Sequence, residues 1–506
     1  MDATKRVIAN TTAQYLKAIV NTCLSLYSTR LVLDALQVTD FGIYALVGGV
    51  VAMLGFITNA LLITTQRYIS FYQGKQDYNY VKKVFSNSLF LHILFSTIIA
   101  LVLLLLKFWL FDGILNIPSE RISTAKDVYV ITVIMLVITI LIAPFKALFI
   151  ARENIVYVSV VEICDGIIKL LMAIGLSYVS SDRLIIYAIM MTSIQLLNLF
   201  VFAGFANWKF EECSIIISRK NINKSIITQL TGFAGWTTYG AGAVAARTQG
   251  ITIIINHFYG TTANAAYGIA AQVNNAITFV SSSIINAMNP QIMKAEGEGN
   301  RQRMLHLAGQ ESKYSTMLLS IVAIPIIMEL PEILSTWLAE VPEYTVMFGM
   351  FALAICLVDQ FTAGLNSANQ AQGNIGTYTL IMYTPKLLNL PLAWFLLANN
   401  FSLTSVMWSV IIVEASIAIL RIPYLKYTSG LNITDYLRQT VIPLIPLLGL
   451  LLSVSWACTQ FLHFPFRFLF TIAICIITGL ITAWTFTLTK NERAYISGLI
   501  KKIRKR

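Results

Sequence analysis

The sequence has little charge and few of the residues that a catalytic or metal centre requires. Charged residues make up 12% of its 506 residues, about half of the share typical of soluble domains. The chain has six cysteines without a CxxC motif and only four histidines. These shortages argue against a soluble globular protein, a disulfide framework and a zinc site. No nucleotide-binding loop and no nucleophile constellation is visible, so we expect no cofactor and no enzyme.

Long apolar segments fill the chain instead, and hydrophobic residues make up 57% of it. A membrane span needs about 20 predominantly apolar residues. We therefore predict an all-α polytopic membrane protein. Its fourteen expected transmembrane helices lie at residues 10–33, 41–66, 84–111, 127–149, 155–178, 183–206, 227–256, 264–289, 313–337, 345–366, 376–397, 402–424, 439–461 and 466–488.

The positive charges predict how these spans are oriented. Of the 36 Lys and Arg residues, 26 lie in the N-terminus, the C-terminal tail and every second gap between spans. Only Arg121, Lys126, Arg183 and Arg467 lie in the other gaps. The positive-inside rule then places both termini in the cytoplasm, which requires an even number of spans. We expect a multi-pass membrane protein.

A weak internal repeat indicates two halves. A shift of 223 residues places span two on span eight, with Tyr44 on Tyr267 and Gly74 on Gly297. The expected partition is a six-helix bundle at 1–223, a second at 224–438, and two further helices with a basic tail at 439–506. The polar linker at 207–226 is expected to lie on the cytoplasmic membrane surface.

Polar residues follow one face of several spans. Asn10, Gln14, Lys17 and Asn21 are spaced by three or four residues and share a face of span one. Such a face must look into protein or water and not into lipid. The candidate cavity residues on spans one, two, seven and eight are Lys17, Arg30, Arg247, Gln14, Asn21, Asn59, Gln229, Gln272 and Asn275. Helix packing through small and polar residues is the alternative reading of these stripes.

A cation inside hydrocarbon costs at least about 2.5–3.5 kcal/mol on insertion scales, so Lys17 and Arg247 indicate a polar pathway. Arg30 lies near the outer end of span one, where it either snorkels or pairs with Asp34. Lys386, next to Pro385, is the lone intramembrane cation of span eleven. We count it with the cavity cations, and we expect Pro385 to interrupt its helix.

Acidic residues within the spans are candidates for ion coupling. Asp165 and Lys169 have the favourable i, i+4 order and are expected to pair, which leaves Glu162 unpaired. Asp359 and Glu414 are interpreted as lone intramembrane acids. Glu162, Asp359 and Glu414 are therefore the predicted proton or sodium sites.

Several short motifs carry a family resemblance. They are Thr-Ala-Gln-Tyr and Leu-Tyr-Ser-Thr-Arg-Leu-Val-Leu in span one, Asp-Phe-Gly-Ile-Tyr before span two, Gln66-Arg67-Tyr68, and Asn289-Pro290-Gln291. With them the chain resembles the Wzx-type polysaccharide flippases of the multidrug/oligosaccharidyl-lipid/polysaccharide exporter superfamily. The resemblance implies two six-helix bundles forming a V in a bacterial cytoplasmic (inner) membrane, with alternating access to a central cavity. It also implies an undecaprenyl-diphosphate-linked oligosaccharide as cargo, of an O-antigen, capsule or lipopolysaccharide pathway, met by cationic residues such as Lys17, Arg247, Arg30 and Lys386.

Three alternatives remain open at this stage: a lipid II flippase, a cation-coupled multidrug exporter of the same superfamily, and a membrane-embedded polysaccharide polymerase or ligase. The charged residues of spans one, two, seven and eight are cations, and that sign favours an anionic cargo. The short outer loops disfavour the enzyme. The expected partners are membrane lipids, a proton or sodium gradient and polysaccharide polymerase machinery, with no nucleic acid.

Overall fold

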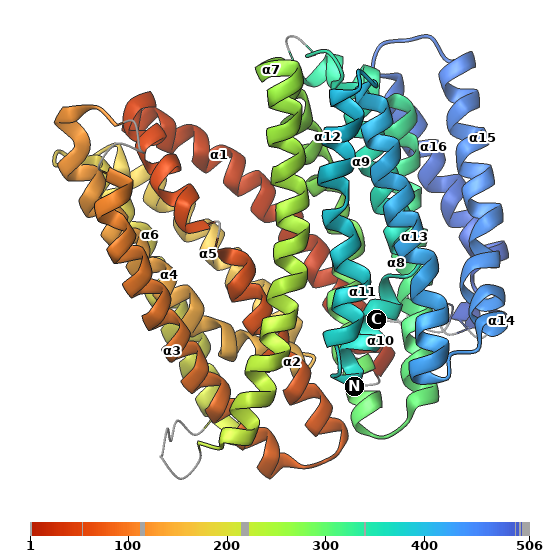
Figure 1. Ribbon diagram of the computed structural model, residues 1–506, viewed down its shortest axis with the longest axis horizontal. Coiled ribbons are helices and arrows are strands. Elements are labelled where there is room, and N and C mark those ends of the chain that lie inside the picture. The colour runs from red at the N-terminus through yellow and green to blue at the C-terminus, as the bar shows by residue number, and fades with distance from the viewer. Residues whose placement is uncertain are drawn as a thin grey trace. The chain divides into compact units, whose positions relative to one another are not determined.

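The structure is a computed structural model that describes residues 3–52, 54–111, 117–213, 222–338, 341–490, 492–494 and 497. Throughout these residues it is helical, with no strand (Figure 1). The helices are α1 (Ala3–Ala52), α2 (Gly55–Gly74), α3 (Tyr78–Trp109), α4 (Ile122–Ala151), α5 (Ile155–Leu176), α6 (Arg183–Lys209), α7 (Lys224–Gly297), α8 (Arg301–Trp337), α9 (Thr345–Gln360), α10 (Ala363–Gln372), α11 (Gly376–Leu387), α12 (Asn389–Ala398), α13 (Leu403–Ser429), α14 (Ile433–Tyr436), α15 (Ile445–Phe461) and α16 (Arg467–Thr482).

The predicted all-α membrane architecture is confirmed. Within the described residues, eight helices are long and apolar enough to cross a membrane, or up to ten if each bent helix pair counts as one span. The chain is a multi-pass membrane protein. The predicted number of fourteen spans stays a prediction. Residues 214–221 of the predicted surface linker lie outside the described residues.

The two longest helices each turn at one residue with left-handed φ. Gln37 interrupts α1 with φ 64° and ψ 167°, and Gly260 interrupts α7 with φ 73° and ψ −168°. In α1 the segments Ala9–Gln37 and Asp40–Gly48 are bent by 118°. Both interruptions fall in the gaps predicted between spans one and two and between spans seven and eight. Because no helix continues through such a backbone conformation, each long helix is two elements.

The same two interruptions support the internal repeat. Gln37 and Gly260 are 223 positions apart, which is the shift proposed from the sequence. The next turn repeats at the same spacing. Gln76 and Gly299 both have positive φ, and the Asp77 and Asn300 side chains accept the N-cap hydrogen bonds of α3 and α8. Three matched pairs of positions, two in backbone conformation and one in helix capping, make the repeat a property of the fold and not a chance match of two residues.

Two glycines allow the end of α2 to cross the end of α7. A Cβ on Gly74 would lie 2.1 Å from the Lys294 carbonyl oxygen, and one on Gly297 would lie 1.8 Å from the Phe71 carbonyl oxygen. Phe71 and Lys294 are also 223 positions apart, so the contact is symmetric under the repeat. Only glycine lets two backbones approach this closely.

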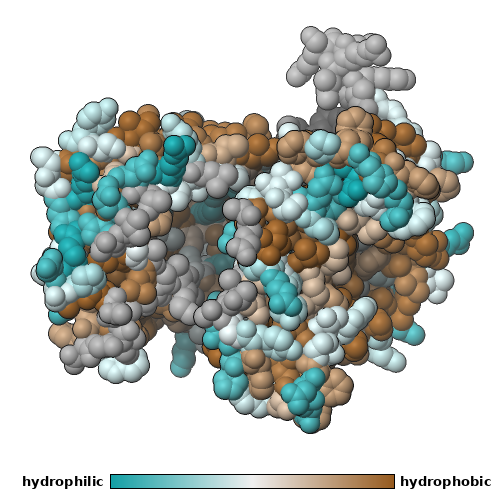
Figure 2. Space-filling model, turned by 90° about the horizontal axis from the view of Figure 1, so that it is seen from above, coloured by the Kyte–Doolittle hydropathy of each residue, from teal (hydrophilic) through white to brown (hydrophobic). Residues whose placement is uncertain are grey.

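By contacts the chain divides into two units. One comprises the described residues through Ala241 with Met293–Gly299, and the other comprises Gly242–Ile292 with the described residues from Asn300 onward. The predicted partition at 223/224 and 438/439 remains a prediction. The first unit packs a core of α1, α3, α4 and α6 around Tyr129 and Leu184. The second packs α7, α9, α12 and α13 around Phe348 and Leu403. Apolar side chains also cover much of the visible surface, as expected for contact with lipid (Figure 2).

Two arginines that depart from the positive-inside pattern, Arg121 and Arg467, are paired with carboxylates. Arg121 contacts Asp40 at 2.5 Å and Asp182 at 2.8 Å. Arg467 contacts Glu329 at 2.8 Å. Burial alone would raise the pKa of Asp182, but its hydrogen bonds from Arg121 outweigh this effect and hold the pKa below its ordinary value. Arg121 and Arg467 therefore form ion pairs that link helix ends to one another.

Candidate functional site

The first unit holds an ionic cluster around Glu162. Lys17 Nζ of α1 lies 2.7 Å from a carboxylate oxygen of Glu162 on α5, and Lys146 of α4 pairs with the other oxygen. The Asn21 side chain donates to the Glu162 carbonyl at 3.2 Å. One turn further along α5, a Cβ on Gly166 would lie 2.7 Å from Asn21 Oδ1, so glycine leaves room for the Asn21 amide at this position.

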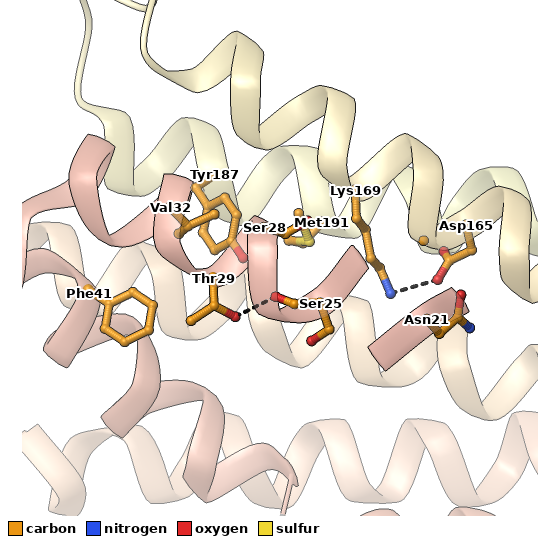
Figure 3. Close-up of a pocket in the computed structure, with 11 residues that line it drawn as sticks. Asn21, Ser25, Ser28, Thr29, Val32, Phe41, Asp165, Lys169, Tyr187 and Met191 are labelled. Carbon is orange, nitrogen blue, oxygen red and sulfur yellow. Dashed lines mark hydrogen bonds and ion pairs between the residues drawn. The ribbon is translucent and has the colours of Figure 1, made fainter. Parts of the chain in front are cut away.

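Beside this cluster lies a cavity of about 240 Å³ between α1, α5 and α6 (Figure 3). Lys169 Nζ reaches Asp165 at 2.7 Å, which confirms the predicted i, i+4 pair. Asn198 of α6 also donates to Asp165, at 2.8 Å. Asn21, Ser25 and other polar residues of the predicted stripe line the same cavity. The cavity therefore presents an ion-paired lysine and aspartate, an amide and hydroxyl groups beside apolar side chains.

The second unit holds a corresponding cluster around Glu414. This carboxylate of α13 is buried, with 2% of its side chain exposed. Arg247 of α7 pairs with one oxygen, and Lys386 of α11 lies 2.7 Å from the other. The helix is interrupted at Leu388, shortly after Pro385, as predicted. The Lys386 carbonyl there accepts a hydrogen bond from the Asn389 side chain at 3.1 Å.

A second ion pair lies in the same unit. Arg421 of α13 contacts Asp359 of α9 at 2.9 Å and donates to the Thr362 hydroxyl at 3.2 Å. The Arg421 side chain is 3% exposed, whereas that of Asp359 is 38% exposed. Asp359 is thus the most accessible carboxylate of the two clusters.

The description of Glu162, Asp359 and Glu414 as unpaired acids is wrong, whereas Lys386 is, as described, the one cation of the predicted span at 376–397. Each acid has an opposite charge within ion-pair distance. An isolated charge in an apolar interior is costly, so cations and acids on neighbouring helices compensate one another. The partner in each case comes from a different helix, which the spacing within one segment does not reveal.

Sequence reasoning missed Lys146 and Arg421, because both were assigned to the gaps between spans. In the structure they lie inside α4 and α13. A signal was present for Arg421, which follows Glu414 by seven residues and so shares its helix face. Lys146 likewise lies within the predicted span at 127–149 by position, although its charge was counted with the following gap.

The two clusters have the same excess of one positive charge. In the first unit three cations meet two acids, and in the second three cations again meet two acids. The members are Lys17, Lys146, Lys169, Glu162 and Asp165, and Arg247, Lys386, Arg421, Glu414 and Asp359. Within the described residues, no group of three or more His, Cys, Asp or Glu side chains could hold a metal ion.

The remaining candidate residues lie outside these clusters. Gln14 is buried in α1, and Asn59 lines a separate, mainly apolar cavity of about 420 Å³ in the first unit. The Gln229 carbonyl accepts from Tyr68 at 3.3 Å. Gln272 and Asn275 are exposed.

Arg30 is also exposed, and it forms no ion pair with Asp34 or any other described residue. Of the two readings of Arg30, the pairing with Asp34 is therefore wrong.

Comparison with solved structures identifies the fold. A MOP superfamily transporter from Pyrococcus furiosus superposes with a TM-score of 0.72 at 13% identity, covering 86% of this chain and 97% of that one. A MATE structure in complex with MaL6 gives 0.71 at 14% identity, covering 87% and 98%. An outward-facing multidrug resistance MATE transporter gives 0.72 at 13% identity, covering 86% and 97%. The chain has the fold of MOP superfamily transporters.

At these identities the likeness concerns the fold alone. Neither a scan against protein-family models nor a search of curated proteins finds a match. The substrate has to be argued from the charges.

Proposed function

We propose that the protein is a transporter that flips a lipid-diphosphate-linked oligosaccharide across the cytoplasmic membrane by alternating access. The observation that carries the proposal is the excess positive charge in both ionic clusters. A diphosphate requires cationic donors in a partly desolvated site, where charge-assisted hydrogen bonds are strongest. Lys17 and Lys169 retain 23% and 37% side-chain exposure, so their charge is accessible.

The test asks whether transport depends on the net positive charge of the cluster or on the Lys17 side chain itself. Lys17→Gln makes the first cluster neutral, whereas Lys17→Gln with Glu162→Gln restores an excess of one positive charge. Surface polysaccharide is measured in cells that depend on this chain, with membrane levels of each variant checked by immunoblot. We expect the single substitution to lower polysaccharide about tenfold or more, as for one lost charge-assisted hydrogen bond of about 1.5–3 kcal/mol.

The double variant is expected to recover part of this loss. The same comparison applies to Arg247→Gln with and without Glu414→Gln. Full polysaccharide production in both single variants would exclude a diphosphate site at these clusters.

The fold likeness to multidrug transporters and the presence of acids in both clusters favour a second candidate, a cation-coupled exporter. One solved transporter of this fold is described as having a binding pocket of reversed polarity that suggests a different function, so the fold itself is not tied to one cargo charge. Efflux of a cationic dye that survives Lys17→Gln but fails in Asp359→Asn would favour the exporter over the flippase.

For energy coupling we infer Asp359 as the first site to test. Glu162 and Glu414 are each held by two cations, whereas Asp359 has one ion-pair partner and a half-buried side chain. A coupling ion has to enter and leave, and this needs access from water. Collapsing the proton and sodium gradients in turn, in vesicles with wild type and Asp359→Asn, measures whether transport depends on either gradient at this residue.

A further inference from the structure

A cavity of about 440 Å³ in the first unit is lined by cations that the ionic clusters do not use. It lies among the start of α1, the α4–α5 turn, the end of α6 and the end of α7. Its lining includes Arg6, Asn10, Arg152, Glu153, Lys209 and Lys294. All come from helix ends at the side where Lys and Arg concentrate, which the sequence predicts to be cytoplasmic.

The charges of this cavity do not cancel. Arg152 is compensated by Glu212, and Arg6 contacts Glu153 at a long 3.5 Å. No carboxylate of the described residues forms an ion pair with Lys209 or Lys294.

The Lys209 ammonium instead lies over the rings of Phe205 and Phe210, 5.2 and 5.9 Å from their centroids. Two ammonium groups therefore remain available to an anion.

The walls of the cavity are ordered by internal hydrogen bonds. Asn10, which is 2% exposed, donates to the Glu153 carbonyl at 2.9 Å and so ties α1 to the α4–α5 turn. Glu153 itself has φ 56°, which sets the sharp direction of this turn. Beside Lys209, the Trp208 side chain is 80% exposed. An exposed tryptophan next to a lysine is typical of the membrane–water interface, where headgroups lie.

We propose that this cavity binds a phosphate group, presented by the headgroup of an anionic phospholipid. Basic pockets between helices on the cytoplasmic side suit such headgroups, because this leaflet carries anionic lipid. One water molecule takes about 30 Å³ of liquid volume, so the cavity accommodates a phosphate with several waters. The site does not depend on the proposed transport function, since none of its residues belongs to either ionic cluster.

The experiment compares two double variants. One carries Lys209→Gln and Lys294→Gln, and the matched control carries Lys82→Gln and Lys83→Gln. Lys82 and Lys83 are exposed at the start of α3 on the same predicted side, so both variants lose two positive charges. The purified full chain is titrated with phosphatidylglycerol, with phosphatidylcholine and with inorganic pyrophosphate. Bound lipid is counted by native mass spectrometry, and the shift in melting temperature is recorded.

We expect phosphatidylglycerol to bind the wild type and the Lys82/Lys83 variant alike, and to bind the Lys209/Lys294 variant about tenfold or more weakly. Arginine at both positions should restore binding. This would show that the glutamine variant binds weakly because it has lost charge and not because it is misfolded. Pyrophosphate that binds with the same dependence supports the phosphate site and assigns a soluble anion to it.

The proposal would be overturned if the wild type and the Lys209/Lys294 variant bound the anions equally well. It would also be overturned if the wild type bound phosphatidylglycerol no more strongly than phosphatidylcholine. Lys17→Gln should leave this binding unchanged whatever it does to transport.

Discussion

At the scale of single residues, burial decides which member of an ion pair the protein can lose. Arg421 is 3% exposed, whereas its partner Asp359 is 38% exposed. Removing the arginine leaves a partly exposed carboxylate unpaired, whereas removing the carboxylate leaves a buried guanidinium unpaired. Removing one partner of this ion pair should therefore cost more stability than removing the other.

Asp359→Asn should therefore destabilise the protein more than Arg421→Gln. An uncompensated buried charge costs about 3–5 kcal/mol, and a half-exposed one costs much less. The midpoint of thermal unfolding in detergent measures the difference. The double variant, which removes both charges, should be more stable than Asp359→Asn alone; a lower midpoint for the double variant would contradict the argument.

Asp182 offers a prediction on pH. Hydrogen bonds from Arg121 lower the pKa of Asp182 in the folded protein. The stabilisation from this group is complete above the pKa of the unfolded chain and is lost as pH falls through the lower pKa of the folded state. The wild type should lose stability in acid, and Asp182→Asn should show a flatter dependence between about pH 5 and pH 2. Parallel curves for wild type and variant would refute this role.

At the scale of elements, the crossing of α2 and α7 depends on backbone contact. Gly74 and Gly297 each face a backbone carbonyl of the other helix, and a carbonyl cannot rotate away as a side chain can. The repeat explains why both positions carry glycine, since one symmetric contact needs both.

Gly74→Ala and Gly297→Ala should each separate this crossing and lower the yield of folded protein. Gly232→Ala is the matched control, because it also lies in a helix and nothing lies within 4 Å of its added Cβ. That change should stabilise by roughly 0.5–1 kcal/mol through helix propensity. Size-exclusion profiles of the three variants measure the effect. Similar behaviour of all three would show that the crossing tolerates a methyl group.

At the scale of the whole molecule, the charge pattern predicts which loops face which side. His463 lies exposed in the turn between α15 and α16, and Lys82 lies exposed at the start of α3. In a cysteine-free background, an impermeant maleimide should label His463→Cys in intact cells and Lys82→Cys only after permeabilisation. Labelling of both from the same side would overturn the even number of spans.

The sequence by itself determined the membrane class, the breaks near Gln37 and Gly260, and the Asp165–Lys169 pair. Each is a local property. The membrane class follows from the length of the apolar segments, the breaks from the chain between two such segments, and the ion pair from the spacing within one helical turn. None of these assignments needs knowledge of any other helix.

Only the tertiary structure decided which charges compensate each other. Lys17 meets Glu162 across α1 and α5, and Arg247 meets Glu414 across α7 and α13, 167 residues apart. The spacing within one helix fixes which side chains share a face, but it does not say which face meets which helix. That choice comes from packing, in which a glycine such as Gly166 leaves room for the Asn21 side chain of the neighbouring helix and an opposite charge compensates a buried one. The three acids therefore looked unpaired in the sequence and are paired in the fold.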